Sequence, residues 1–342
     1  MTSAPVALSA YTTLGLGGPA GRFIEAASHD ELAVAVRAAE QAGDPVLVLG
    51  GGSNLVVADD GFPGTVIHVA TKGVRIRERG SDGPGGTRTA AVTAAAGETW
   101  DRLVERTVSE GLSGIECLAG IPGLVGATPI QNVGAYGQEV SQTILAVRAF
   151  DRHSGEVVTR SSAQCEFGYR DSMLKRAAAG CATGRYIVLD VTFELRRSSA
   201  SGPTLSAPVQ YDELAKSLGV ALGAQVPLEQ ARAAVLELRR EKGMLLDPGD
   251  PDTRSAGSFF TNPVLTPEQF AEVQRRAAER RGPQTRVPYL HVDNGDGAVR
   301  VSAAWLVERA GFGRGYGDAG PHLDQAHAGA DQSRQRGHGR AA

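Results

Sequence analysis

The spacing of apolar residues predicts several helices along the chain. In the clearest one, Trp100, Leu103, Val104 and Val108 fall at positions i, i+3, i+4 and i+8, and Gly111 closes the run. Such spacing places the apolar side chains on one face, which is typical of a helix packed on a core. The predicted helices cover residues 28–43, 99–110, 227–242, 267–281 and 302–310.

Runs of aliphatic and β-branched residues without helical spacing predict strands. They cover residues 46–49, 55–58, 65–70, 144–151, 156–160 and 186–196. The polar, glycine-rich residues 80–88 predict a hairpin tip or loop, and residues 198–208 (SSASGPTLSAP) predict a linker between domains. Because strands and helices alternate irregularly, the pattern indicates an α+β fold and not a regular βαβ repeat.

Composition adds few constraints beyond those of a globular protein. The chain has 342 residues, of which 42% are hydrophobic and 21% charged, and its net charge is −3. The length suits two or three compact units. The balance of charge gives no indication of nucleic-acid binding. No run of residues is long and apolar enough to predict a membrane span, and the N-terminus does not resemble a secretory signal.

The residue types that commonly bind metals are scattered. Cys117, Cys165 and Cys181 show neither disulfide nor metal-site spacing, and the seven histidines show no ligand pattern. We therefore expect no metal, and a reducing cytoplasm is the simplest setting.

Residues 120–139 (GIPGLVGATPIQNVGAYGQE) form the most informative segment. They contain five glycines, two prolines and a single charge, Glu139. A solvated linker would carry more charge and serine. Glycine lets the backbone approach a ligand closely and point N–H groups at it, so one interpretation is a buried anionic cofactor. The other is a set of tight turns in a β-rich core, and the segment alone favours neither.

A second glycine segment lies upstream. Residues 46–57 (VLVLGGGSNLVV) predict a strand, a glycine turn at Gly50–Asn54 and a second strand. This is neither a phosphate-binding loop that ends in Gly-Lys-Ser/Thr nor a strand–GxGxxG–helix unit. Residues 15–20 do match GxGxxA, but no strand clearly precedes them, and Pro19 and Gly21 disfavour a helix there.

Further motifs follow in a recognisable order: GYRDS at 168–172, GSFFTNP at 257–263 and VSAAWL at 301–306. Together with the two glycine segments, they resemble the longer-loop branch of the UDP-N-acetylenolpyruvoylglucosamine reductase family (MurB), from about Tyr11 to about Gly317. The resemblance implies a two-lobed FAD-binding fold of the vanillyl-alcohol-oxidase type plus a separate α+β substrate domain. The implied divisions are residues 1–197 (FAD-binding, with a lobe boundary near 70–75), 198–208 (linker), 209–317 (substrate-binding) and 318–342 (an aberrant, disordered tail).

The same resemblance implies a reaction and a cofactor. Family members reduce UDP-N-acetylglucosamine enolpyruvate with FAD and NADPH, in the synthesis of peptidoglycan precursors. Such a reaction needs a group that stabilises the enolate and a positioned proton donor. The implied FAD-binding residues are Gly50, Gly51, Gly52, Ser53, Asn54, Leu55, Ile121, Pro122, Gly123, Gly126, Ala127, Thr128, Gln131, Asn132, Gly134, Ala135 and Tyr136.

Two residues carry the implied chemistry. Arg170 would hold the substrate carboxylate, because a guanidinium offers two parallel donors to it. The alternative is a structural arginine that pairs with a nearby carboxylate such as Asp171. Ser258, between Gly257 and two phenylalanines, would donate the proton, and its alternative is an ordinary turn or capping serine.

The substrate also carries a diphosphate. By resemblance Tyr211, Lys242 and Asn262 bind that nucleotide half, with Tyr169 beside Arg170 as a further substrate-binding residue. Lys242 is alternatively a solvated lysine at a helix C-terminus, and Tyr211 an ordinary half-buried aromatic residue.

The end of the chain departs from the family pattern. Family members continue after the helix at 302–310 with a strand, a helix and a final strand that carries an active-site glutamate. Here no aliphatic, methionine or aromatic side chain larger than alanine follows Leu323. A frameshift in the coding sequence, or an error in reading it, would explain this departure. We expect residues 318–342 to be disordered and the chain to be a poor reductase. The remaining alternatives are an inactive flavin- and nucleotide-binding protein and a flavin oxidase on the same fold. We expect a monomer.

Overall fold

The computed structural model describes residues 5–80, 88–178, 182–197, 204–250, 253–255, 259–292 and 296–313. It divides into two compact units: unit 1 comprises Met1–Glu241 with Leu245–Pro248, and unit 2 comprises Lys242–Met244 with Gly249–Ala342. Ser258 and the predicted disordered tail at 318–342 lie outside the described residues.

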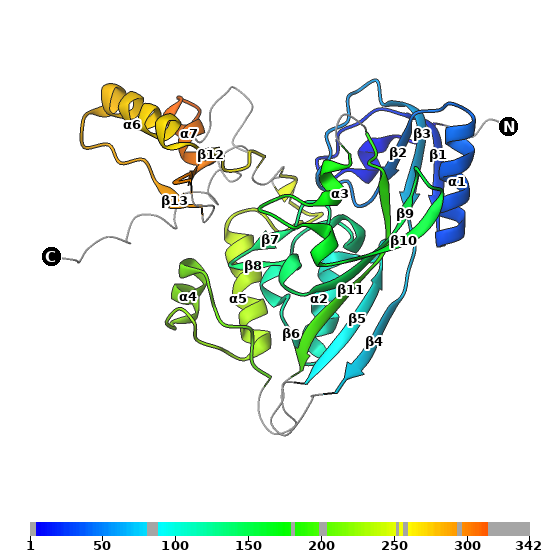
Figure 1. The fold of residues 1–342 in the computed structure, drawn as a ribbon, viewed down its shortest axis with the longest axis horizontal. Coiled ribbons are helices and arrows are strands. Elements are labelled where there is room, and N and C mark those ends of the chain that lie inside the picture. Colours follow the sequence, from blue (N-terminus) through cyan, green and yellow to red (C-terminus); the bar gives the residue numbers. More distant parts are fainter. Residues whose placement is uncertain are drawn as a thin grey trace. The chain divides into compact units, whose positions relative to one another are not determined.

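The first lobe of unit 1 is a small parallel sheet with one helix. Strands β1 (Ala20–Ala26), β2 (Val46–Leu49) and β3 (Phe62–Val69) pair in the order β1-β3-β2, and α1 (His29–Gln41) packs beside them (Figure 1). The Ser28 hydroxyl accepts a hydrogen bond from the Glu31 backbone N–H at 3.2 Å, which caps α1. Leu32 and Val36 are buried on its inner face, as their spacing predicts.

The second lobe is a larger antiparallel sheet in the order β10-β9-β11-β5-β4, with the short β6 paired to β11. Its strands are β4 (Val74–Arg79), β5 (Thr89–Ala95), β6 (Leu112–Ser113), β9 (Ile144–Asp151), β10 (Glu156–Ser161) and β11 (Tyr186–Arg197). Helix α2 (Trp100–Ser109) buries Trp100 against Phe193 of β11, with ring centroids 5.8 Å apart. This pair anchors the helix on the sheet.

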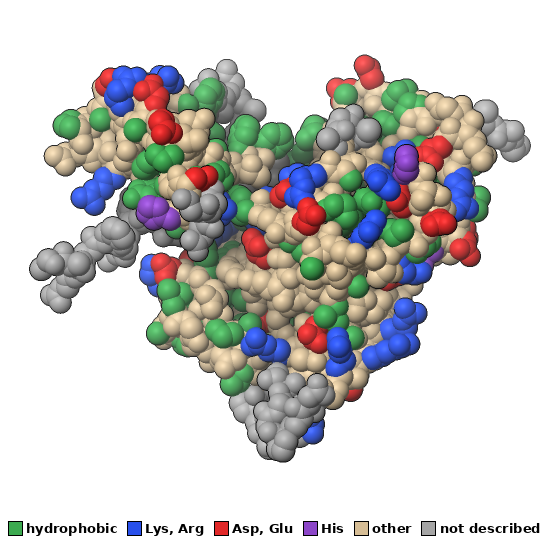
Figure 2. All heavy atoms as spheres, in the orientation of Figure 1, with side chains coloured by type: hydrophobic (Ala, Val, Ile, Leu, Met, Phe, Trp, Pro, Cys, Tyr) green, Lys and Arg blue, Asp and Glu red, His purple; other side chains and the backbone are tan. Residues whose placement is uncertain are grey.

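Strand β4 forms an edge of this sheet. Arg75, Arg77 and Arg79 are exposed along it, and Figure 2 shows Lys and Arg side chains gathered on this side of unit 1. Charged side chains on an edge strand oppose pairing with another chain.

Polar contacts join the two lobes. Arg148 of β9 places Nη2 2.8 Å from Nδ1 of His29 in α1, and Nε of Arg152 donates to Oε1 of Glu40 at 2.7 Å. Because these contacts involve both ends of α1, they hold this helix of the first lobe against the sheet of the second.

Short elements and two further helices complete unit 1. The short elements are η1 (Leu8–Tyr11), η2 (Glu116–Leu118), η3 (Val125–Ala127), β7 (Gly134–Ala135), β8 (Gln138–Glu139), η4 (Val140–Gln142), η5 (Ala163–Cys165) and α3 (Met173–Arg176). Helices α4 (Asp212–Leu218) and α5 (Leu228–Glu241) also belong to this unit. The compact units therefore divide later in the chain than the predicted linker at 198–208.

Unit 2 contains a three-stranded antiparallel sheet and two helices. Strands β12 (Val264–Leu265), β13 (Tyr289–His291) and β14 (Val299–Val301) pair in the order β12-β14-β13, accompanied by α6 (Pro267–Arg281) and α7 (Ala303–Arg309). Val287, Val299, Val301 and Trp305 form its core.

Most predicted elements are confirmed, and one strand is wrong. Residues 55–58 form no strand, because the carbonyl of Ala58 instead accepts from the Gly18 N–H at 2.9 Å and Val57 packs near Gly17. Among the longer strands, β1, β4 and β5 are not predicted by the sequence pattern. Among the described residues, no helix has the length and apolar character needed to cross a membrane.

Candidate active site

The two glycine segments lie against each other in unit 1. A Cβ added to Gly51 would lie 2.8 Å from Cα of Gly123, and one added to Gly123 would lie 2.7 Å from Oγ of Ser53. Such distances are too short for real Cβ atoms, so the absence of side chains lets these backbones meet. The predicted cofactor-binding loops of the two lobes are thus brought together.

The upstream loop presents backbone donors. Within the described part of the chain, the N–H groups of Gly51, Gly52, Ser53 and Asn54 donate no hydrogen bond. Consecutive N–H groups without protein acceptors form a concave donor surface that suits phosphate oxygens. The loop therefore fits the diphosphate of a dinucleotide cofactor.

Residues with left-handed backbone gather around the second loop. Asn132, Tyr136 and Arg170 are non-glycine residues with φ of 45°, 48° and 54°. Such conformations persist only where surrounding contacts hold them, and they are common at functional sites. Asn132 is 1% exposed, and its Nδ2 donates to Oε2 of Glu139 at 2.8 Å and to the carbonyl of Gly168 at 2.9 Å.

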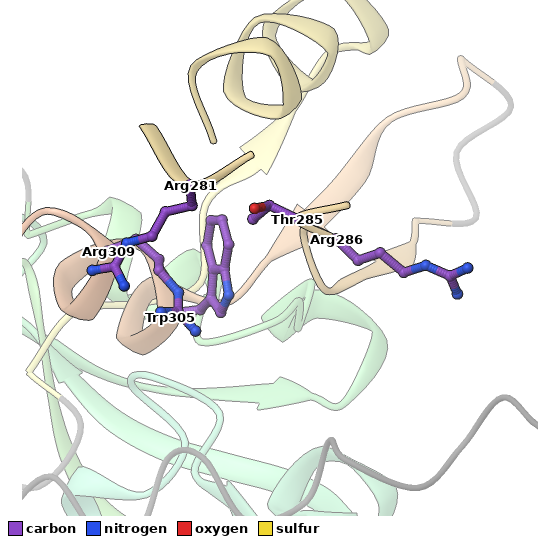
Figure 3. Close-up of a pocket in the computed structure, with 5 residues that line it drawn as sticks. All are labelled: Arg281, Thr285, Arg286, Trp305 and Arg309. Carbon is purple, nitrogen blue, oxygen red and sulfur yellow. The ribbon is translucent and has the colours of Figure 1, made fainter. Parts of the chain in front are cut away.

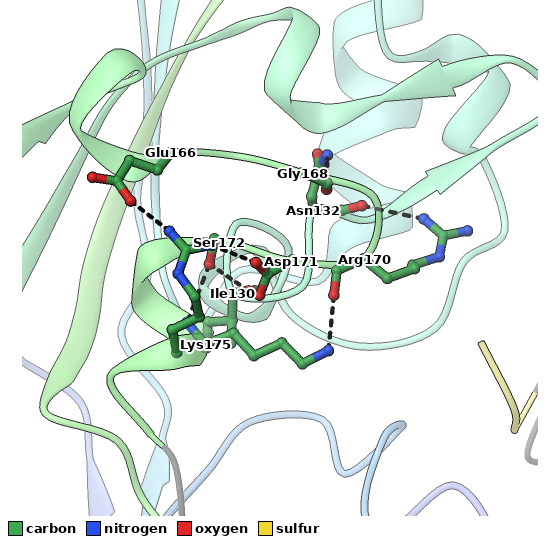
Figure 4. Close-up of polar contacts among 9 residues, drawn as sticks. Ile130, Asn132, Glu166, Gly168, Arg170, Asp171, Ser172 and Lys175 are labelled. Carbon is green, nitrogen blue, oxygen red and sulfur yellow. Dashed lines mark hydrogen bonds and ion pairs between the residues drawn. The ribbon is translucent and has the colours of Figure 1, made fainter. Parts of the chain in front are cut away.

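The side chain of Arg170 points at this loop (Figure 4). Its Nη1 donates to the carbonyl of Asn132 at 3.2 Å and its Nη2 to the carbonyl of Gly134 at 2.5 Å. Because a guanidinium carries five N–H donors, these two bonds leave donors for a carboxylate. Arg170 is therefore positioned by the carbonyls of the downstream glycine loop.

The alternative pairing of Arg170 with Asp171 is wrong. Asp171 instead forms an ion pair with Arg176, which also contacts Glu166 at 2.6 Å. Ser172 caps α3 through the Lys175 N–H at 3.2 Å and donates to the carbonyl of Ile130 at 2.5 Å. The GYRDS segment is thus a turn held by its own polar residues, with Arg170 directed away from Asp171.

An aromatic and cationic cluster lies beside the second loop. The rings of Tyr136 and Tyr211 meet edge to face with centroids 5.6 Å apart. Burial raises the pKa of Tyr136 to about 12, against the opposing effect of the nearby Arg239 guanidinium. Arg239 is not among the residues predicted from the sequence. The sequence does contain a signal that could have identified it: Arg239 is a charged residue four positions after Val235, which places it on the apolar face of α5.

The remaining predicted residues are divided between the two units. Tyr169 lies in unit 1, with the Arg170 guanidinium 5.6 Å from its ring centroid. Lys242 follows α5, and Oδ1 of Asn262 accepts from the Ala303 N–H at 2.9 Å at the start of α7. Ser258 lies outside the described residues, whereas its neighbours Phe259 and Phe260 are 68% and 62% exposed. Tyr136, Arg170 and Tyr211 all lie in unit 1, whereas Lys242 and Asn262 belong to unit 2.

Unit 2 also contains a hollow of about 320 Å³, lined by Arg281, Thr285, Arg286, Trp305 and Arg309. Figure 3 shows the indole of Trp305 between Arg281 and Arg309 on one side and Thr285 on the other. The Arg309 guanidinium lies 5.7 Å from the ring centroid. Neither Lys242 nor Asn262 lines this hollow.

Comparison with known proteins identifies the family. Residues 20–161 match the FAD binding domain family model. The UDP-N-acetylenolpyruvoylglucosamine reductase of Thermobifida fusca is 55% identical over 312 residues, which cover 91% of this chain and 82% of that protein. The corresponding reductase of Streptomyces coelicolor is 51% identical, over 94% of this chain and 78% of that protein.

A solved structure is also similar. The crystal structure of the reductase from Thermus caldophilus is 28% identical, covers 86% of each chain and gives a TM-score of 0.49. The matched FAD binding domain confirms the predicted FAD-binding α+β fold class. With 55% identity over most of both chains, this protein belongs to the UDP-N-acetylenolpyruvoylglucosamine reductase family.

Proposed function

We propose that this chain reduces UDP-N-acetylglucosamine enolpyruvate to UDP-N-acetylmuramate, with FAD as cofactor and NADPH as co-substrate. The observation that carries the proposal is the contact between the two glycine loops beside Arg170. It occurs in a chain that is 55% identical to a UDP-N-acetylenolpyruvoylglucosamine reductase. We place the reaction in the synthesis of peptidoglycan precursors in the cytoplasm, by a monomer.

FAD, when bound, would supply the redox chemistry between NADPH and the enolpyruvyl double bond. The chain supplies position and electrostatics. The free N–H groups of the Gly51–Asn54 loop would hold the diphosphate, and the loop that contains Asn132, Gly134 and Tyr136 would hold the rest of the cofactor. Close packing of glycine backbone leaves little room for water between the loops.

Arg170 and Ser258 carry the proposed chemistry on the substrate. Arg170 donates to the substrate carboxylate and stabilises the negative charge that develops there. Ser258 donates the proton to the adjacent carbon. Tyr169, Tyr211, Lys242 and Asn262 are the proposed contacts of the substrate, the last three with its nucleotide half.

The proposal predicts that the purified protein is yellow and contains FAD. Because the binding loops offer hydrogen bonds and no His or Cys occurs in residues 50–57, FAD should leave on denaturation. Absorbance before and after denaturation and filtration measures this. A folded protein that takes up no added FAD would contradict the proposal, and FAD that remains on the denatured chain would favour the oxidase alternative.

Replacing Gly51 by alanine should weaken FAD binding by at least about 10-fold, which corresponds to about 1.4 kcal/mol. The new Cβ would lie 2.8 Å from Cα of Gly123, so the two loops must separate. Fluorescence titration of the apoprotein with FAD measures the dissociation constant. Gly80→Ala is the control, because a Cβ there meets nothing within 4 Å. Equal affinity of Gly51→Ala and the parent would contradict the loop assignment.

A further inference from the structure

The carboxylate of Glu116 has no role in the function proposed so far. Glu116 lies in η2, shortly before the downstream glycine segment, and is 0% exposed. Moving a charge out of water is unfavourable unless nearby groups compensate for it. Within the described part of the chain, Glu116 forms no ion pair with Lys or Arg, so backbone N–H groups supply the compensation.

Two short hydrogen bonds hold this carboxylate. Its Oε2 accepts from the Gly114 N–H at 2.6 Å, and its Oε1 accepts from the Ala207 N–H at 2.6 Å. Hydrogen bonds to an ionised acceptor are shorter and stronger than those between neutral groups. The first bond is local, whereas the second joins residues that are 91 positions apart. Glu116 therefore ties a distant segment of the chain to η2.

That distant segment is the described part of the predicted linker, residues 204–208, with its continuation to Tyr211. It is docked on unit 1, because Val209 is 1% exposed and belongs to the main hydrophobic core. Pro208 directly follows Ala207, and its ring fixes one backbone dihedral between the anchored residue and Tyr211. The position of Ala207 therefore constrains the position of Tyr211.

The other end of this segment lies against the downstream glycine segment. A Cβ added to Gly137 would lie 2.7 Å from Cβ of Gln210, so the missing side chain lets the two segments meet. The next residue, Tyr211, packs its ring edge to face on Tyr136. All of these residues belong to unit 1. Residues 207–211 are thus held at one end by Glu116 and at the other by the glycine segment.

We propose that Glu116 is a positioning residue, which holds residues 207–211 in place and so sets the position of Tyr211. Without this anchor, Tyr211 would have to be ordered when the substrate binds, which weakens binding. The inference rests on the proposed function, in which Tyr211 contacts the nucleotide half of the substrate. It assigns the effect of Glu116 to substrate binding and not to the reduction of FAD by NADPH.

The test measures the dissociation constant of UDP-N-acetylglucosamine enolpyruvate on the oxidised, FAD-loaded protein, from the change in flavin absorbance. Glu116→Met keeps an unbranched side chain of similar length and removes both acceptor oxygens. It should raise the dissociation constant about 10-fold and leave the rate of FAD reduction by NADPH unchanged. Asp151→Asn is the matched control, because Asp151 carries a buried carboxylate of unit 1 that pairs with Arg185. It should leave the dissociation constant unchanged.

A double-mutant cycle separates positioning from general damage to the fold. In a Tyr211→Ala background, Glu116→Met should have no further effect on the dissociation constant. An equal fold-change with and without the Tyr211 ring overturns the inference, as does an unchanged constant in Glu116→Met. A parent protein that binds FAD but not this substrate would instead contradict the proposed function.

Hydrogen exchange decides the matter if Glu116→Met does not fold. In the parent protein, the Ala207 N–H should exchange as slowly as the amides of β11, because its acceptor is a buried carboxylate. Exchange at the rate of an exposed loop would overturn the inference.

Discussion

Replacing Ser258 by alanine should slow reduction of the enolpyruvyl substrate by about 10²–10⁴-fold while leaving the reduction of FAD by NADPH nearly unchanged. The proposed proton donor acts only in the half-reaction with the substrate, so measuring the two half-reactions separately isolates its role. Stopped-flow absorbance of the flavin measures each half-reaction in turn.

The comparison uses two versions of the protein. Both the 342-residue chain and a version with a relative's C-terminal segment should be measured, so that the effect is determined in a version that turns over. Ser258→Thr is the control, since threonine keeps a hydroxyl. If Ser258→Ala reduces the substrate at the parent rate, the donor is another group.

Replacing Arg170 by alanine should lower kcat for the enolpyruvyl substrate by about 10²–10³-fold, the usual cost of removing a donor to a developing oxyanion. It should also raise KM, because the same guanidinium binds the ground-state carboxylate. Arginine and alanine both carry a Cβ, so the substitution leaves the backbone strain at φ 54° unchanged. Steady-state kinetics with varied substrate measures both constants.

Arg170 also donates to the carbonyls of Asn132 and Gly134, so its loss should loosen the downstream glycine loop. FAD content must therefore be measured alongside the rate. Arg176→Ala is the control, because it removes a nearby arginine that pairs with Asp171 and Glu166 instead of the loop carbonyls. If Arg170→Ala retains both FAD and the parent rate, the carboxylate is held elsewhere.

The sequence predicts those elements whose pattern is local. The helix around Trp100 has regular apolar spacing, and β9 at 144–151 is a largely apolar run. In contrast, β4 alternates arginine with aliphatic residues at a sheet edge, and β5 is mostly alanine and threonine. Their strand character comes from pairing with other segments, which local propensity does not contain.

The site shows the same division. The glycine loops can be identified from their composition and motifs. Their contact through Gly51 and Gly123 depends on the tertiary structure, so the sequence alone does not predict it. Arg239 is missed because a basic residue near a helix C-terminus is ordinarily solvated, and only tertiary packing, including that on Gly120, buries it. The pairing of Asp171 with Arg176 likewise depends on the turn at 168–172.

The most direct test of the central claim is the anaerobic reoxidation of NADPH-reduced protein by UDP-N-acetylglucosamine enolpyruvate. NADPH should bleach the flavin absorbance, and the substrate should restore it, with one UDP-N-acetylmuramate formed per flavin. The version with a relative's C-terminal segment serves as the reference for turnover. Flavin that is bleached by NADPH, stays reduced with the substrate in both versions and recovers only with oxygen would contradict a reductase of this substrate.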